Sequence, residues 1–128
     1  MSSWSISELA REFGTTLRTI RYYEDLGLIA PERHGVRRVY RPRDRVRLRL
    51  ILRGRRLGMS LDEIATIIDL YDRPTGEAGQ LEFLLTAIAR HRASLERQRD
   101  DLDHLLGEFA ELEAACRDDL DRLGQSSD

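Results

Sequence analysis

One stretch of the chain carries side chains suited to reading the edges of DNA bases. Between Thr16 and Glu24, Leu17, Ile20 and Tyr23 recur at helical spacing, so they would hold a helix to its body. The opposite face then presents Arg, which can fork onto guanine or grip phosphate, and Thr, which can contact a thymine methyl group. The alternative is an exposed basic face without a ligand. The residues that we expect to contact a major groove are Thr16, Arg18, Thr19, Arg21 and Tyr22.

A second group of cations lies in residues 29–41. Apolar and polar residues alternate there around a turn near His34-Gly35, which predicts a two-stranded hairpin, or wing. A hairpin that carries Arg suits the DNA backbone or minor groove, whereas the alternative is a charged hairpin that protects its own edge. Two roles fit Tyr40 equally well: its hydroxyl could donate to a phosphate, or its ring could pack beneath the wing. The wing residues that we expect to contact DNA are Arg33, Arg37, Arg38 and Tyr40.

A dense run of Arg follows over residues 45–56. A helix turns through every direction, so not all of these cations can face DNA. We expect some to pair with acids such as Asp44, Asp62 and Glu63, and a minority to contact phosphate. Arg53 is the member of the run that we expect at the DNA backbone.

Short helices must position these side chains. Two capping boxes, Ser5 with Glu8 and Ser60 with Glu63, each mark the start of a helix, and Gly or Pro residues mark the ends. The pattern predicts a winged helix-turn-helix DNA-binding domain over 1–73, followed by a linker over 74–79. The predicted helices span about 6–13, 17–26, 43–57 and 61–72.

The remaining residues, 80–128, have a coiled-coil pattern. An apolar residue occupies every seventh position from Leu81 to Leu123, and a companion row is apolar at both ends and polar in the middle. Gly107 allows a bend or an early stop, because glycine costs about 1 kcal/mol inside a helix. Such a helix needs a partner, and a second copy of the chain is the simplest one. The expected dimerisation residues are Leu81, Leu84, Ile88, Leu95, Leu102, Leu105, Phe109 and Leu112.

The charges divide unevenly along the chain. Residues 1–60 hold 14 Arg and 6 acidic residues, a net charge of +8, whereas residues 61–128 hold 7 Arg and 17 acidic residues, a net charge of −10. This asymmetry indicates a half that faces nucleic acid and a half with another role. No apolar run is long enough to span a membrane, and the N-terminus has no signal-peptide pattern, so we expect a cytoplasmic protein without a membrane partner.

The same residues argue against several kinds of chemistry. The single cysteine, Cys116, excludes an internal disulfide and cannot alone close a zinc site. No nucleophile–base pair or glycine-rich phosphate loop occurs, so we expect no enzyme, no cofactor and no metal. Cys116 falls at an apolar heptad position, where a small buried side chain is favoured over a redox or metal sensor. His91 lies in the companion row, where fixing the register is favoured over metal or pH sensing.

Three motifs resemble the MerR family of transcription regulators. They are Ser5-Ile6-Ser7-Glu8-Leu9-Ala10, then Thr19-Ile20-Arg21-Tyr22-Tyr23-Glu24 followed by Gly27-Leu28, and finally Arg37-Arg38-Val39-Tyr40. The resemblance covers nearly the whole chain. Within the family the chain is most similar to the LiuR-type branch, through residues 40–48, 50–58 and 67–72.

The resemblance implies a homodimer joined by an antiparallel pair of C-terminal helices. Two recognition helices would enter successive major grooves of a pseudo-palindromic promoter and distort the duplex so that RNA polymerase can engage it. The LiuR-type branch implies control of branched-chain amino-acid or acyl-CoA catabolism. Metal-sensing relatives place a cysteine where this chain has residues 76–80 without one. A small effector would bind between the coiled coil and the DNA-binding heads, or past about residue 113.

Two other interpretations stay open at this point. The chain could be a coiled-coil interaction protein with a basic nucleic-acid-binding head and no effector sensing, or a metal or redox sensor through Cys116. Duplex DNA is favoured over RNA, because a wing and a recognition helix fit grooves better than splayed bases.

Overall fold

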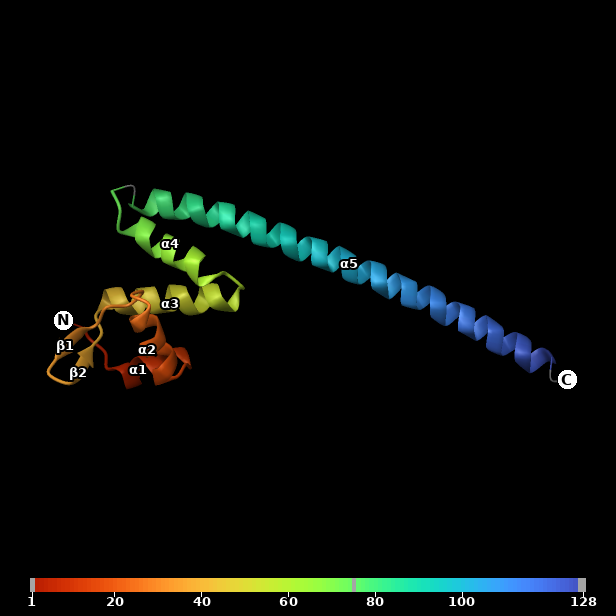
Figure 1. Cartoon of the computed structure of the whole chain (residues 1–128), viewed down its shortest axis with the longest axis horizontal. Helices are drawn as coiled ribbons and strands as arrows, with labels where there is room; N and C mark the ends of the chain where they lie inside the picture. The colour runs from red at the N-terminus through yellow and green to blue at the C-terminus, as the bar shows by residue number, and fades with distance from the viewer. Residues whose placement is uncertain (1, 75, 127–128) are drawn as a thin grey trace. The chain divides into compact units, whose positions relative to one another are not determined.

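The computed structural model describes residues 2–74 and 76–126, and it is mainly helical, as the sequence predicts. Figure 1 shows the elements in chain order. They are α1 (Ile6–Phe13), α2 (Leu17–Asp25), β1 (Glu32–His34), β2 (Arg37–Val39), α3 (Pro42–Arg56), α4 (Leu61–Tyr71) and α5 (Gly76–Ser126). The two strands form one antiparallel hairpin, so the winged helix-turn-helix architecture is confirmed.

Local capping explains where the short helices begin. Ser5 accepts a hydrogen bond from the amide of Glu8 at 3.1 Å, and the Glu8 carboxylate accepts one from the Ser5 amide at 2.9 Å. Ser60 and Glu63 form the same reciprocal pair at the start of α4. Gly14 ends α1 in the left-handed region at φ 63°, which glycine adopts without a steric penalty. Both capping boxes predicted from the sequence are therefore present.

The core of the first part of the chain forms around α3. Figure 1 shows α3 between the α1–α2 pair on one side and α4 on the other. Every one of these helices contributes a side chain that is 0–1% exposed. The fully buried side chains are Leu9, Ile20, Ile29, Tyr40, Leu48, Ile51, Ile64 and Ile67. Gly54 brings α3 close to α4, because a Cβ atom there would lie 2.9 Å from Cδ1 of Ile64.

The hairpin is short and continues into a further backbone pairing. Its register pairs Glu32 with Val39, and the turn occupies Gly35 and Val36, one residue later than the sequence predicts. Val36 is 94% exposed, because it belongs to the turn and not to the alternating strand. After β2, Tyr40 exchanges two backbone hydrogen bonds of 2.9 Å with Trp4, which ties the N-terminal segment to the wing.

The linker expected over residues 74–79 is wrong from residue 76 onward. Helix α5 begins at Gly76, so residues 76–79 are helical. Glu77 and Ala78 account for the difference, because an acidic first turn and a strong helix former favour the helix over the loop that the two glycines suggest. Thr75 of that linker, and residues 127–128 of the predicted coiled-coil region, lie outside the described residues.

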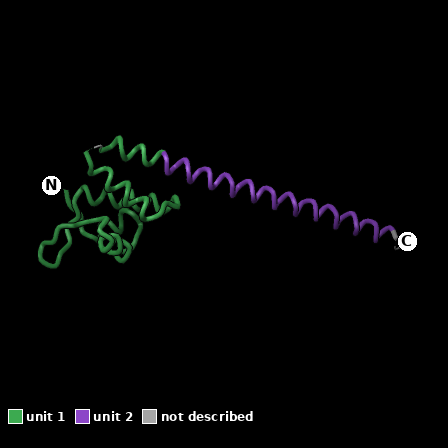
Figure 2. Tube along the Cα trace, turned by 45° about the horizontal axis from the view of Figure 1, so that its top comes forward, with its two compact units in different colours: residues 1–85 green, residues 86–128 purple. Residues whose placement is uncertain are grey.

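The chain divides into two compact units, residues 1–85 and 86–128 (Figure 2). Within the second unit, helix α5 continues through Gly107 to Ser126 without the bend or stop that glycine allows. Among the described residues, no helix is both long enough and apolar enough to cross a membrane.

The heptad positions of α5 present an apolar stripe to solvent in the single chain. Leu84 is half-buried, and the other seven expected dimerisation residues are 45–68% exposed. Cys116 is exposed as well, so a single chain does not bury it as the heptad pattern suggests. Large apolar side chains in a row are uncommon on the surface of a monomer and mark an interaction site.

Candidate nucleic-acid interface

Helix α2 has one buried face and one face of exposed polar residues. Ile20 and Tyr23 are 0% and 7% exposed, so they fix the helix to the core, and Leu17 lies at the margin at 37%. Arg18 and Arg21 are exposed on the rest of the surface, and Tyr22 is 50% exposed. The structure therefore brings these side chains to one solvent-facing surface of the predicted recognition helix.

The two threonines of the predicted site have a structural role at the start of α2. The Thr16 hydroxyl accepts a hydrogen bond from the Thr19 amide at 3.1 Å and donates one to the Thr19 hydroxyl at 2.8 Å. Thr16 is therefore the N-cap of the helix, with its hydroxyl group already engaged. The Thr19 hydroxyl keeps its own hydrogen for an outside acceptor.

Glu24, at the last turn of α2, binds the wing. Arg38 donates from Nε to Glu24 Oε2 at 2.8 Å, and Arg33 donates from Nη2 to Glu24 Oε1 at 3.3 Å. The Glu24 side chain is 15% exposed and Arg38 is 24% exposed, so this contact is shielded from solvent. Two of the cations expected to contact DNA, Arg33 and Arg38, therefore also hold the wing to α2.

Tyr40 lies beneath the wing, which is the second of the two positions that the sequence allows. Its side chain is 0% exposed, and its hydroxyl donates to Glu24 Oε2 at 3.4 Å. Burial, and then the neighbouring Glu24 carboxylate, raise the pKa of Tyr40 to about 12. A side chain with no exposed surface does not reach phosphate, so the expectation of a DNA contact at Tyr40 is wrong for this structure.

Several cations remain available for a polyanion. Within the part of the chain that the structure describes, no carboxylate pairs with Arg18, Arg21, Arg37 or Arg53. Arg53 lines a hollow together with Gly14 and Thr15, in the turn that precedes α2. Unpaired guanidiniums on α2, on the wing and beside this turn are the arrangement that phosphate contacts require.

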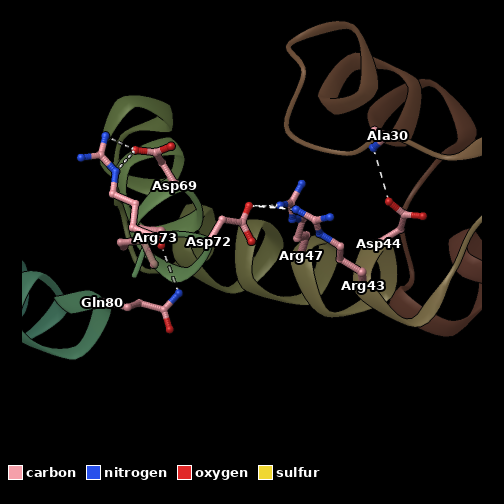
Figure 3. Close-up of polar contacts among 9 residues, drawn as sticks. Ala30, Arg43, Asp44, Arg47, Asp69, Asp72, Arg73 and Gln80 are labelled. Atoms are coloured by element: carbon pink, nitrogen blue, oxygen red, sulfur yellow. Dashed lines mark hydrogen bonds and ion pairs between the residues drawn. The ribbon is translucent and has the colours of Figure 1, made fainter. Parts of the chain in front are cut away.

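Three other arginines of α3, Arg43, Arg45 and Arg47, pair with acids that the sequence does not single out. Arg45 donates from Nε to both carboxylate oxygens of Glu12, at 3.0 and 2.8 Å, and its guanidinium lies 5.3 Å from the centroid of the Trp4 ring. Arg43 and Arg47 both bind Asp72 at the end of α4 (Figure 3). The expectation that some of these arginines pair with acids is confirmed, although the acids that bind these three are Glu12 and Asp72.

Asp44 has a different role. It is 5% exposed, and its carboxylate accepts hydrogen bonds from the backbone amides of Arg41 at 2.9 Å and of Ala30 at 3.3 Å. The first of these bonds caps α3, and Figure 3 shows the second reaching the loop before the wing. The sequence predicts that Pro42 and Asp44 open this helix, and this prediction is confirmed.

The sequence did not single out Glu24, which binds the wing, or Trp4, whose ring contacts the Arg45 guanidinium. Glu24 appears in the sequence only as one member of a motif, and its role depends on a hairpin 9 to 14 residues further along the chain. Among the described residues, no group of three or more His, Cys, Asp or Glu side chains is placed to hold a metal ion.

Known proteins share both the sequence pattern and the fold. The chain is 38% identical over 107 residues to the HTH-type transcriptional regulator HmrR from Rhizobium leguminosarum bv. viciae, covering 80% of this chain and 83% of that protein. A MerR-family transcriptional regulator from Bacillus cereus matches with a TM-score of 0.65 at 29% identity, over 86% of this chain and 79% of that one. A lead(II)-bound transcription regulator from Ralstonia metallidurans CH34 matches with a TM-score of 0.62 at 30% identity, over 80% and 82%.

Two family models cover most of the chain between them. One, described as MerR HTH family regulatory protein, matches residues 4–70, and the other, described as MerR, DNA binding, matches residues 45–112. The first match contains α2 and the wing, and the second continues into α5. The chain therefore belongs to the MerR family of DNA-binding transcriptional regulators.

Proposed function

We propose that the protein acts as a homodimer on a pseudo-palindromic promoter, which it distorts so that RNA polymerase can engage it. The observation that carries this proposal is that one chain has both an exposed cationic face on α2 and an exposed apolar stripe on α5. In the proposed division, residues 1–73 bind DNA and residues 80–126 form the dimer. Because the protein would act on promoter DNA, we infer that it works in the cytoplasm.

The α5 stripe supports the dimer. Its expected members, from Leu81 to Leu112, leave seven large apolar side chains about half exposed in one chain. Two copies that pack these stripes together as an antiparallel coiled coil would bury them. Each Å² of apolar surface removed from water stabilises the dimer by about 25 cal/mol. A second copy also supplies the second recognition helix that a palindromic site requires.

The cations without carboxylate partners support the DNA contacts. Arg18, Arg21 and Tyr22 would read the major groove from α2, with Thr16 and Thr19 at its first turn. Arg37 would bind the backbone from the wing, joined by Arg33, which is 55% exposed despite its ion pair with Glu24. Arg53 would bind phosphate beside the turn before α2.

We further propose that the protein belongs to the LiuR-type branch and controls genes of branched-chain amino-acid or acyl-CoA catabolism. The support is the sequence similarity in residues 40–48, 50–58 and 67–72. Transcript profiles of a strain without the protein should show these genes among the most changed. Transcript changes confined to metal-efflux genes, with the same changes in a Cys116→Ser strain, would contradict membership of this branch. They would favour metal sensing instead.

Binding to the promoter of its own gene tests the central proposal. Fluorescence anisotropy on that duplex, and on a scrambled duplex of equal length, should show two protomers per site and a preference for the promoter at every salt concentration. Equal affinity for both duplexes would overturn sequence-specific regulation and favour the basic-headed interaction protein instead.

In vitro transcription tests the distortion. If the protein compensates for promoter hexamers set too far apart, shortening the spacer by one base pair should make transcription less dependent on the protein. A scrambled spacer of the original length is the matched control. Unchanged dependence on the protein after shortening would overturn the distortion mechanism while leaving DNA binding intact.

A further inference from the structure

A cavity of about 350 Å³ opens between α3, α4 and the first turns of α5, within the compact unit of residues 1–85. Its walls are mostly apolar: Ile68 is 7% exposed and Leu50 is half-buried, while Val46 and Tyr71 are more than half exposed. The volume equals roughly a dozen water-sized groups at about 30 Å³ each, which is within the range of small-molecule sites.

Two guanidiniums at this cavity share one carboxylate oxygen. Arg43 donates from Nη2 to Asp72 Oδ2 at 2.9 Å, and Arg47 donates to the same oxygen. Figure 3 shows both side chains of α3 directed at Asp72, the C-cap residue directly after α4. Two positive charges against one negative charge leave an excess of one positive charge at a cavity with apolar walls.

The neighbouring acid of α4 does not balance that charge. Asp69 binds Arg73, which donates from Nε to Asp69 Oδ2 at 2.9 Å, so this pair is neutral by itself. Figure 3 shows this pair separate from the Arg43–Arg47–Asp72 cluster. The Arg47 side chain is only 16% exposed, so water screens its charge weakly.

We propose that this cavity binds a small monocarboxylate with a compact apolar body, either aliphatic or aromatic. The ligand carboxylate binds Arg43 and Arg47 in competition with Asp72, and its body packs against Ile68 and Leu50. Guanidinium forks bind carboxylates in two-point geometry, and apolar walls favour a ligand with no second charge. The excess positive charge is the feature that selects a carboxylate over a neutral molecule of the same shape. The site goes beyond the proposed function, because neither DNA contacts nor the α5 stripe require it.

Calorimetric titration of the full-length protein tests the site with two matched pairs of probes. Benzoate and hexanoate supply a carboxylate, and benzamide and hexanamide replace it with a neutral group of similar shape. We expect saturable binding of the carboxylates that is at least about tenfold tighter than that of the amides. Equal affinity for acid and amide would overturn the proposal.

Substitutions at the cluster give opposite expected signs. Asp72→Asn removes the internal competitor, so benzoate should bind several-fold more tightly, whereas Asp69→Asn, the matched control one turn away, should leave the affinity unchanged. Arg47→Gln should abolish the preference for carboxylates. Arg43→Gln provides the same test at a side chain that is 67% exposed, where misfolding is not expected.

Two further outcomes would overturn the proposal. Benzoate binding by Asp72→Asn but not by the natural protein would mean that Asp72 keeps the site closed to carboxylates. Binding only by a monomeric variant, Leu95→Asp, would mean that a second copy of the chain fills the cavity. Promoter binding measured on the same samples separates these failures from a failure of the proposed function.

Discussion

Glu24 and Arg38 join the end of the recognition helix α2 to strand β2 through an ion pair of 2.8 Å. Because Arg33 and Tyr40 bind the same carboxylate, one acidic side chain fixes the wing relative to the helix. The wing thereby commits two of its cations to internal structure, at least in part. Among the described residues of the wing, Arg37 is the arginine that no carboxylate binds.

Glu24→Gln should loosen the wing and release its arginines. We expect the free energy of unfolding in urea to fall by about 1–3 kcal/mol, since a shielded charged hydrogen-bond network loses its acceptor charge. The salt dependence of promoter binding should steepen by up to about two phosphate contacts, because Arg33 and Arg38 become free. Unchanged stability together with an unchanged salt slope would contradict this role for Glu24.

Glu32→Gln is the control for that substitution. Glu32 also lies in the wing and binds Arg41 at 2.8 Å, but its side chain is 55% exposed. Exposed ion pairs contribute about 0–1 kcal/mol, so its loss should change stability by less than Glu24→Gln does.

Arg18→Ala and Arg21→Ala should each weaken promoter binding by about 1–3 kcal/mol if the side chain reads a base. Anisotropy on promoter and scrambled duplexes measures the effect, and the preference for the promoter should shrink. Arg73→Ala is the control, because Arg73 binds Asp69 on α4, away from the exposed face of α2. An equal loss of affinity for both duplexes would instead mean that the residue contacts phosphate.

Local signals in the sequence predicted most of the fold. The capping boxes at Ser5 and Ser60 and the apolar spacing in α2 act within one or two helical turns, so they locate the short helices within about one residue. The start of α5 was missed, because Gly76 and Gly79 suggest a loop while the helix that follows extends back over them.

The polar partners of the site depend on tertiary packing. Arg38 and Glu24 are 14 residues apart, Arg43 and Asp72 are 29 apart, and Arg45 and Glu12 are 33 apart. Composition shows that acids must balance some of the arginines, but the choice of partner follows from how α1, α3 and α4 pack. The sequence therefore identifies the exposed cations of α2 better than those of the wing or of α3.

Stability should fall as the pH drops below about 4.5. A hydrogen bond from Arg45 lowers the pKa of Glu12 below its ordinary value of 4.5, and one from Arg41 lowers the pKa of Glu32. These carboxylates bind protons more readily in the unfolded chain, so their contribution is complete above pH 4.5 and is lost as the pH falls through the folded-state pKa. Thermal unfolding at pH values from 7 to 3 should show this loss.

Glu12→Gln should make that pH dependence shallower, because one of the groups responsible is gone. Arg45→Gln should have a similar effect on the slope, since it removes the donor that lowers the pKa of Glu12. If both variants kept the slope of the natural protein, the Glu12–Arg45 pair would not contribute to acid unfolding.

Gly54→Ala and Gly107→Ala should have opposite effects on stability. At Gly54 the added methyl group meets Ile64, which is 1% exposed and lies 2.9 Å away at Cδ1, so overpacking of about 1–3 kcal/mol should outweigh the gain in helix propensity. At Gly107 nothing lies within 4 Å, so the propensity gain of about 1 kcal/mol should appear alone. Urea unfolding of both variants checks the contrast, and a stabilised Gly54→Ala would show that α3 and α4 can separate without cost.

Leu95→Asp should dissociate the dimer. Leu95 is 59% exposed in the single chain and lies in the middle of the heptad row, so a second copy would bury it and a carboxylate there would be left without a partner. Ala93→Asp is the matched control. Ala93 is exposed and lies two residues earlier, off the stripe, and both variants introduce the same residue, Asp, into the helix. Sedimentation equilibrium should show a monomer for Leu95→Asp and a dimer for Ala93→Asp. Promoter affinity should fall by at least about 100-fold for Leu95→Asp alone, since the two half-sites are no longer bound together. A dimeric Leu95→Asp, or equal dissociation of both variants, would show that the α5 stripe is not the dimer interface.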